Sequence, residues 1–481
     1  IDRFAFQSCR NLETVTLPES LTTINNDAFK ECSKLTSIDI PNKVTKLNDN
    51  TFSNCSSLKN VSIGSGCNSI STTAFINAYA IDKITVAEDN KNFTVVDGVI
   101  YNKDKTTLVL YPKNRAGEFA VPDTITSIAD YAFDNAPNLT KVTIGENVKS
   151  VGTGAFRNCN SLETVIFKDS DAVQKTIGDY AFNNCPALTK VDFGNAVKSI
   201  GNYAFMVDKS LESLEFPDSL ESIGYCAFSC LSGGTYSTYV ASNLKSIKFG
   251  SGLKTIGNHA FYENRSLETV EFTGNNLTSI GYSAFCNCVT LANLNLTGNN
   301  VVIADYAFAS NSTLKEVVLS GVKTIGYCAF SGDYALKSVD LGEGLISIDR
   351  YAFQSCRNLE TVILPESLTT INNDAFKECN KLTRIDIPNK VTKLNDNTFA
   401  NCTSLKNVSI GSGCTSISST AFLNSNAIEK ITVAEDNKNF TVVDGVLYSK
   451  DMTTLVLYPK NRSGEFAVPD TVTTIADYAF D

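Results

Sequence analysis

An Ala-Phe or Thr-Phe pair recurs along this chain at a short and nearly constant interval. The Phe of this pair occurs eighteen times in 481 residues, and most steps between successive copies are 22 to 24 residues long. Two steps of 58, one of 26 and one of 33 interrupt the series. A unit of this length cannot bury its own apolar face, so the copies must stack on one another as the coils of a solenoid.

Each unit has the same internal order of apolar residues. One copy places Leu, Val and Leu within residues 12–17, then Pro18, then Leu and Ile within 21–24, and finally Ala28-Phe29 with Cys32 three residues later. The first group puts its side chains on one side of a short extended segment, and Pro18 marks its end because proline cannot donate a ladder hydrogen bond. We therefore expect an α/β-type solenoid of about eighteen coils with short parallel strands, whose Phe rings share one continuous column.

A longer repeat is superimposed on the short one. Residues 1–134 align without gaps to residues 348–481 and agree at 116 of 134 positions. The differences are mostly exchanges between aliphatic or small polar residues, and no repeated Phe differs, as expected for a packed interior with a tolerant exterior. Because both ends of the chain fall inside a unit, we interpret residues 1–481 as a single solenoid cut from a longer array.

Three insertions explain the long steps. Residues 87–122 and their near-copy 434–469 contain β-forming runs on either side of the turn-like sequence 102–105, which predicts a β-hairpin insertion in each. Residues 229–243 form a polar loop insertion that carries Tyr236 and Tyr239. Insertions in solenoids tend to lie on one rim, often the binding face, so these two tyrosines are candidate contacts of a rim loop.

The fifteen cysteines are better explained by packing than by chemistry. Nine of them follow the repeated Phe by three residues, so they are expected to form an internal ladder of small, buried thiols. A metal site would favour Cys-x-x-Cys pairs, which the chain lacks. The sequence therefore predicts no metal site and no cofactor.

Composition excludes several other classes of protein. A net charge of −10 argues against nucleic-acid binding, which needs clusters of Lys and Arg. No stretch approaches the roughly 20 apolar residues of a membrane-spanning helix. The single His and the incomplete Gly-rich loops offer no catalytic or nucleotide-binding arrangement, so we do not expect an enzyme.

The unit resembles the BspA-type leucine-rich repeat over essentially the whole chain. The matching pattern is L-x-x-I/V-x-I/L-P, then V-x-x-I, then A-F-x-x-C, and the block from Val95 to Pro112 is similar to a hairpin block of that family. The resemblance implies a leucine-rich repeat superhelix from a bacterial or protist surface protein, extracellular or at the cell surface. It implies adhesion to host matrix proteins or to other cells, and no fixed ligand residues.

The third and fifth residues of each L-x-x-V-x-L segment are expected to face solvent, and we name this row the strand strip. It is polar, of mixed charge and free of aromatic rings, which disfavours sugar binding by ring stacking there. The strip residues that we single out as candidate protein contacts are Lys141, Ile166, Lys190, Glu215, Lys248, Glu271, Asn295, Val318, Ile363 and Arg384.

Two functional hypotheses follow. In the first, the solenoid is an adhesion module that presents its strip and rims to protein partners. In the second, the repeated 347-residue block builds a structural stalk or self-assembling filament with no discrete ligand. A solvated sheet surface without any ligand remains the simplest interpretation of the strip.

Overall fold

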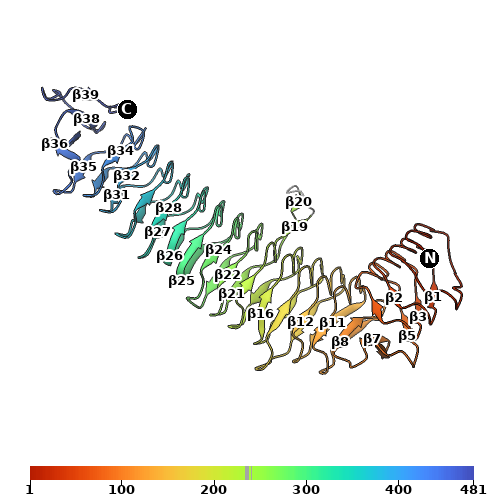
Figure 1. Ribbon diagram of the computed structural model, residues 1–481. Helices are drawn as coiled ribbons and strands as arrows, with labels where there is room; N and C mark the ends of the chain where they lie inside the picture. Colours follow the sequence, from red (N-terminus) through yellow and green to blue (C-terminus); the bar gives the residue numbers. More distant parts are fainter. Residues whose placement is uncertain (233–237, 240, 481) are drawn as a thin grey trace. The chain divides into compact units, whose positions relative to one another are not determined.

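The computed structural model describes residues 1–232, 238–239 and 241–480, and of residues 231, 232, 238 and 239 it describes the backbone only. The chain divides into two compact units, unit 1 from Ile1 to Leu244 and unit 2 from Lys245 to Asp481. Each unit is a β-solenoid. Within each unit, successive coils lie one on the next (Figure 1).

Most coils contribute a first strand and a short second strand to two parallel ladders. The registers join equivalent residues of neighbouring repeats, for example Ile38 with Val61 and Val61 with Ile84. The first strands of unit 1 are β1 (Ser37–Ile40), β3 (Asn60–Ile63), β5 (Lys83–Val86), β9 (Gly117–Ala120), β11 (Leu139–Ile144), β13 (Thr164–Phe167), β15 (Lys190–Asp192) and β17 (Ser213–Glu215). Its second strands are β2 (Lys46–Leu47), β4 (Ser69–Ile70), β10 (Ser127–Ile128), β12 (Ser150–Val151), β14 (Lys175–Ile177), β16 (Val197–Ile200) and β18 (Ser222–Ile223).

Unit 2 repeats this arrangement, except that β25 (Asn293–Ile303) and β26 (Glu316–Ile325) each run through both ladders. Its other first strands are β21 (Ser246–Phe249), β23 (Thr269–Phe272), β27 (Ser338–Asp340), β29 (Thr361–Ile363), β31 (Arg384–Ile387), β33 (Asn407–Ile410) and β35 (Lys430–Val433). Its other second strands are β22 (Thr255–Ile256), β24 (Ser279–Ile280), β28 (Ser347–Ile348), β30 (Thr370–Ile371), β32 (Lys393–Leu394), β34 (Ser416–Ile417) and β39 (Thr474–Ile475).

The return side of each coil, which we call the turn arc, is built from turns. Around Phe29, the backbone turns into the left-handed region at every fourth residue, with φ of 57° at Asp27 and 64° at Glu31. The amide of Phe29 donates to Thr51 O of the next coil at 2.9 Å, whereas the amide of Lys30 donates back to Asp27 O at 3.2 Å. Alternate amides therefore bond the next coil instead of their own.

This bonding pattern corrects the expected fold class. The solenoid with short parallel strands is confirmed, but the helices of an α/β fold are not found anywhere in residues 1–232, 238–239 and 241–480. A helix commits each amide to the carbonyl four residues earlier, and the arc cannot do this while alternate amides bond the following coil. Left-handed residues also break any helical run, and Asn, which tolerates this conformation, occupies many of these positions.

The repeated Phe rings stack as expected, but not in one uninterrupted column. In unit 1, one stack runs from Phe6 to Phe75 and a second begins with Tyr111 and continues from Phe133 through Phe228. In unit 2, a stack runs from Phe261 to Phe422 at centroid distances of 5.0 to 5.7 Å. The prediction of a single column is therefore wrong at residues 87–122, where a tyrosine opens the next stack.

The block at 87–122 has three antiparallel strands rather than one hairpin. They are β6 (Phe93–Val96), β7 (Val99–Asn102) and β8 (Thr107–Leu110), and the second copy has β36 (Phe440–Val443), β37 (Val446–Ser449) and β38 (Thr454–Leu457). Asp97 and Gly98 form the first turn with φ of 48° and 79°, as a two-residue hairpin loop requires. Strand β8 then pairs in parallel with β10, so the block leads directly into the next second strand.

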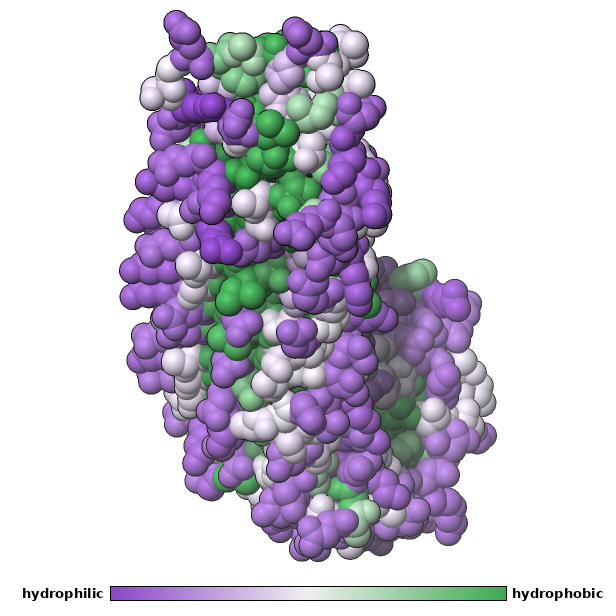
Figure 2. All heavy atoms as spheres, turned by 90° about the vertical axis from the view of Figure 1, so that its left-hand side faces the viewer, coloured by the Kyte–Doolittle hydropathy of each residue, from purple (hydrophilic) through white to green (hydrophobic). Residues whose placement is uncertain are grey.

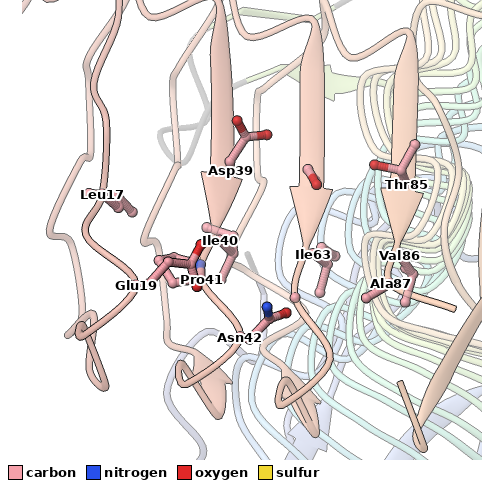
Figure 3. A pocket seen from close by; sticks show the side chains of 12 residues that line it. Leu17, Glu19, Asp39, Ile40, Pro41, Asn42, Ile63, Thr85, Val86 and Ala87 are labelled. Carbon is pink, nitrogen blue, oxygen red and sulfur yellow. The ribbon is translucent and has the colours of Figure 1, made fainter. Parts of the chain in front are cut away.

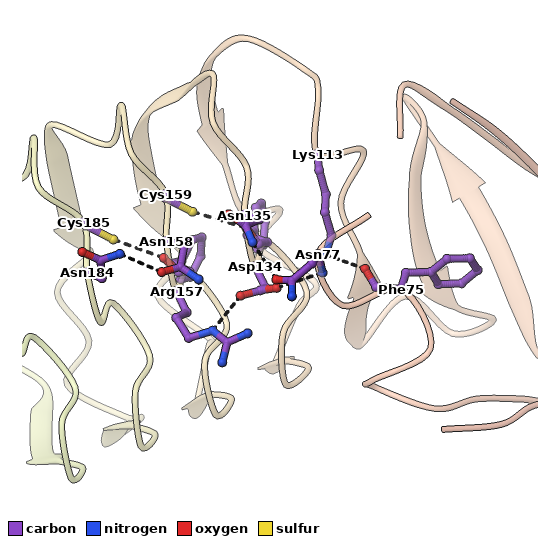
Figure 4. Close-up of polar contacts among 12 residues, drawn as sticks. Phe75, Asn77, Lys113, Asp134, Asn135, Arg157, Asn158, Cys159, Asn184 and Cys185 are labelled. Atoms are coloured by element: carbon purple, nitrogen blue, oxygen red, sulfur yellow. Dashed lines mark hydrogen bonds and ion pairs between the residues drawn. The ribbon is translucent and has the colours of Figure 1, made fainter. Parts of the chain in front are cut away.

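A buried polar cluster joins the coils on either side of this block (Figure 4). Lys113 is fully buried and its Nζ donates to Phe75 O at 3.1 Å. Asp134, also buried, accepts from Arg157 Nε at 2.8 Å and from the Asn77 amide at 3.5 Å. Burial lowers the pKa of Lys113, and the Asp134 carboxylate opposes that shift. The cluster therefore fastens the coil before the insertion to the two coils after it.

The exterior contrasts with this interior. The face shown in Figure 2 is mostly hydrophilic, and its hydrophobic residues gather in a band with hydrophilic residues along both sides. Among the described residues, no helix is long and apolar enough to cross a bilayer.

The stacks predict a local response to mutation. Phe182 is fully buried between Phe156 and Phe205, with both centroid distances 5.0 Å. Replacing Phe182 by Ala should lower the free energy of unfolding by about 3–5 kcal/mol. Hydrogen exchange should rise first in the adjoining coils, because each coil contacts only its neighbours.

The exposed Phe4→Tyr change, which matches Tyr351 of the other copy, should alter stability by less than about 0.5 kcal/mol. Equal loosening of distant coils in the Ala variant would contradict this account.

Candidate functional site

The strand strip of unit 2 forms a row of side chains in direct register. Lys248 pairs with Glu271, Glu271 with Asn295, and Asn295 with Val318. The row then continues through Asp340 to Ile363. All six residues are exposed, so neighbouring coils present them side by side on one face. Arg384, in the next coil, is exposed as well and belongs to the parallel row of third-position residues.

The strip of unit 1 is more interrupted. Lys141 and Lys190 lie in one row with Thr164 between them, whereas Ile166 lies in the other row beside Asp192. Lys190 and Glu215 are exposed, but Lys141 and Ile166 are only half-exposed. Lys141 also forms a 2.9 Å ion pair with Glu118 of the preceding strand. The candidate residues of unit 1 therefore make no continuous patch.

An apolar pair stands out in the strip of unit 2. Val318 is 41% exposed and Ile363 is 73% exposed. Beside them, Arg384 makes a two-pronged contact with Asp386, at 2.8 and 3.1 Å. Val318 and Ile363, the apolar centre of this patch, lie on either side of Asp340 in the register, and charged side chains next to exposed apolar area are usual at protein interfaces.

The two near-identical copies differ chemically at this patch. Ile363 corresponds to Thr16 in the first copy, and Arg384 corresponds to Ser37. These two exchanges add an apolar side chain and a cation to the surface, whereas most of the other differences conserve polarity. Comparison of the copies within the sequence could have revealed this signal, because both positions belong to the strip.

A shallow groove of about 290 Å³ borders the strip of unit 1 where the strands end (Figure 3). We call it the strand-end groove. Its polar side consists of the strip residues Asp39, Ser62 and Thr85, and Ile40 and Ile63 line it from the buried side. Within the described chain, Asp39 has no ion-pair partner, although its counterpart Asp386 is neutralised by Arg384. The strip thus has an acidic hollow in one copy and a paired charge in the other.

The two rim tyrosines cannot be assigned to a site. Tyr236 lies outside the described residues, and only the backbone of Tyr239 is described. That backbone belongs to a short antiparallel pair of β19 (Leu231–Ser232) with β20 (Thr238–Tyr239).

The cysteines form the expected ladder along the inside of the turn arc. All fifteen are thiols rather than disulfides, and of the nine ladder positions only Cys9 is exposed. Each buried thiol of the ladder donates to the carbonyl of the repeated Phe one coil earlier, as Cys55 does to Phe29 O at 3.1 Å. Burial raises the pKa of Cys356 and Cys379, so they remain protonated donors. No group of three or more potential metal ligands occurs in the part of the chain that the structure covers.

Two carboxyl groups occupy the same ladder position as these thiols. Asp208 accepts from the Cys185 amide at 2.7 Å, and Asp333 accepts from the Asn311 amide at 2.8 Å. The second oxygen of each has no hydrogen-bond partner among the described residues. Burial raises the pKa of both groups well above the usual range of an aspartate. Burial of these two carboxyl groups therefore lowers the stability of the fold at neutral pH.

This arrangement predicts a pH-dependent stability. Below pH 4, near the ordinary pKa of an aspartate, the folded and the unfolded chain both carry a proton on Asp333. Above that pH the unfolded chain loses this proton, whereas the folded chain retains it. Stability is therefore lost as pH rises, by up to about 1.4 kcal/mol per pH unit, until the folded pKa is reached. Asp333→Asn should gain stability relative to the wild type between pH 4 and 7, measured as urea midpoints. Asp39→Asn changes an exposed carboxylate and should not give this gain in stability. If the stabilities of Asp333→Asn and of the wild type change in parallel with pH, the assignment is refuted.

Comparison with known proteins agrees with the repeat architecture. Residues 1–103, 113–233, 234–342 and 323–443 match the family model of the BspA type leucine rich repeat region. A leucine-rich repeat protein from Bacteroides ovatus is 25% identical over 88% of this chain and 93% of that chain, with a TM-score of 0.57, and it shares the solenoid fold.

Two further structures are less similar. A leucine rich cell surface protein from Faecalibacterium prausnitzii is 25% identical over 72% of this chain and 96% of that chain, with a TM-score of 0.34. The pneumococcal vaccine antigen PcpA is 19% identical over 72% of this chain and 94% of that chain, with a TM-score of 0.40. No protein of curated function matches the chain.

Proposed function

We propose that this chain, which belongs to the BspA-type leucine-rich repeat family, is an adhesion module that binds protein partners outside the cell or at the cell surface. The observation that carries the proposal is the in-register row of exposed side chains in unit 2, with Val318 and Ile363 among charged neighbours. A binding role without catalysis or cofactor is part of the proposal.

The geometry of the row supports a protein ligand. Six strands at about 4.8 Å spacing carry the side chains from Lys248 to Ile363 over about 24 Å, which is the breadth of a protein contact rather than of a small molecule. Val318 and Ile363 offer apolar area for burial. Lys248 and Glu271 at one end of the row, and Asp340 between the two apolar residues, can set the register and orientation of a partner.

The backbone beneath this row is already ordered before a partner arrives. Each strand is hydrogen-bonded to the coil before and the coil after it, so binding orders few backbone torsions. Low ordering entropy leaves more of the contact energy available for affinity.

The first copy supplies the variants that test this proposal. Ile363→Thr and Arg384→Ser each install the residue that the other copy carries at the same position, so the fold tolerates them. The double variant should bind at least about tenfold more weakly to whichever partner the wild type retains from a panel of purified matrix proteins and whole cells, because the apolar centre and the adjacent cation are lost. Surface plasmon resonance measures the loss.

A matched control comes from the same comparison. Asn426→Tyr also exchanges one copy's residue for the other's, at a position outside the strip, and should leave binding unchanged. Absence of binding across the panel would reject the proposal, as would an equal loss in the Asn426→Tyr variant.

A structural role is the second candidate, and the near-identity of residues 1–134 and 348–481 favours it. Repetition of a block serves reach or assembly when no single copy has its own ligand. In that case the wild-type chain should assemble into fibres visible by electron microscopy and retain no partner from the panel.

A further inference from the structure

Besides the strand-end groove of unit 1, there is a hollow in unit 2 that is separate from the strand strip. It lies where the second strands meet the turn arc, has a volume of about 410 Å³ and opens to solvent. We call it the second-strand groove. The side chains that line it and that carry the argument are Asn258, Tyr282, Val302, Asp305, Asp349 and Asn372. They come from five of six successive coils, the sixth contributing Gly326, and none of them belongs to the strip.

The groove exists because small residues form its floor. Gly326 and Ala304 lie where the next two repeats carry Asp349 and Asn372, and where the two preceding repeats also carry glycine. A Cβ on Gly326 would lie 2.7 Å from Asp305 Oδ1 and 2.7 Å from the backbone carbon of Ala304, so no larger residue fits without movement. The absent side chain leaves a gap between Asp305 and Asp349.

The carboxylates that wall this gap are held in place, but each retains hydrogen-bonding capacity. Asp305 Oδ1 accepts from the Tyr327 amide at 2.9 Å. Asp349 Oδ1 accepts from the Arg350 amide at 2.7 Å and from Asn372 Nδ2 at 2.9 Å. In the part of the chain that the structure describes, neither Oδ2 has a hydrogen-bond or ion-pair partner. Two fixed acceptors therefore remain available to a ligand.

The groove also offers an apolar platform. Tyr282 is 40% exposed, and its ring is supported edge-on by His259 at 5.1 Å and by Tyr306 at 5.6 Å. Asn258 fixes the backbone of Tyr282 by accepting from its amide at 2.9 Å. Val302, 44% exposed, is a second apolar surface of the groove. The platform is rigid because its neighbours on both sides are aromatic.

We propose that the second-strand groove binds a neutral carbohydrate through Tyr282, Asp305, Asp349 and Asn372. A sugar has an apolar face of C–H groups that packs on an aromatic ring, and edges of hydroxyl groups that donate to carboxylates and exchange hydrogen bonds with amides. An anionic glycan is disfavoured because Asp305 and Asp349 would repel it, and the whole chain is negative as well. A protein ligand is disfavoured because the hollow has the volume of a small-molecule site, roughly 300–1,000 Å³.

The test is a glycan array probed with the intact 481-residue chain, followed by calorimetry with the neutral oligosaccharide that binds best. Tyr282→Ala should weaken that binding at least about tenfold, because the stacking surface is lost. Asp305→Asn and Asp349→Asn should each weaken it severalfold, since the amide keeps the acceptor that bonds the backbone and replaces only the unpartnered oxygen. Thermal unfolding of each variant verifies that it is folded.

Unit 1 supplies the controls. Asp179→Asn alters a carboxylate that makes the same bond to the next coil, 2.7 Å from the Asn202 amide, and Tyr180→Ala removes a tyrosine that is 38% exposed. Neither lines the groove, so neither should change glycan binding. Ile363→Thr should not change it either, which separates this proposal from the protein-binding one. Retention of no glycan, retention of sialylated or sulfated glycans only, or an equal loss in the Asp179→Asn control would each overturn the inference.

Discussion

The structure depends on the way in which the turn arc uses its amides. Alternate residues of the arc, such as Phe29 and Glu31, donate to carbonyls of the next coil, and the residues between them bond locally. This satisfies a buried backbone without a helix, and it fixes each repeated Phe directly over the Phe of the coil before it. The same backbone hydrogen bonds therefore determine both how the coils stack and how the Phe rings stack.

That constraint also determines where binding surfaces can form. Because coils are tied to their neighbours on both sides, equivalent residues of successive repeats become spatial neighbours. A row such as Asn295, Val318 and Asp340 is therefore assembled from residues about 23 positions apart. Variation at one repeat position then changes one element of a surface without disturbing the core. The Thr16 to Ile363 exchange illustrates this, since it makes one strip apolar where its copy is polar.

Much of this could be predicted from the sequence. The spacing of Phe29, Phe52 and Phe75 predicts stacked coils, and the position of Cys55 predicts a buried thiol. The helical component was wrong because residue spacing does not reveal that alternate amides of the arc bond the next coil. The interruption of the Phe column was missed because Tyr111 takes the place of a Phe outside the repeat pattern. The turn at Asp97-Gly98 was a readable signal, since this pair is typical of a two-residue hairpin loop.

The candidate sites were less predictable than the fold. The strip followed from alternation along each strand, but its exposure and its apolar centre depend on individual coils. The second-strand groove could not be read from one repeat, because Tyr282, Asp305 and Asp349 come from separate coils and line one hollow only when those coils are stacked. Surfaces of this kind arise from deviations between repeats, whereas the repeat pattern itself describes the core.

Residue-resolved hydrogen exchange on the intact wild-type chain tests the central claim most directly. If the arc amides bond the next coil, the amides of Phe156, Phe182 and Phe205 should be as strongly protected as those of the neighbouring strand β13. Exchange of these three amides at the rate of exposed loops, with β13 still protected, would contradict the account.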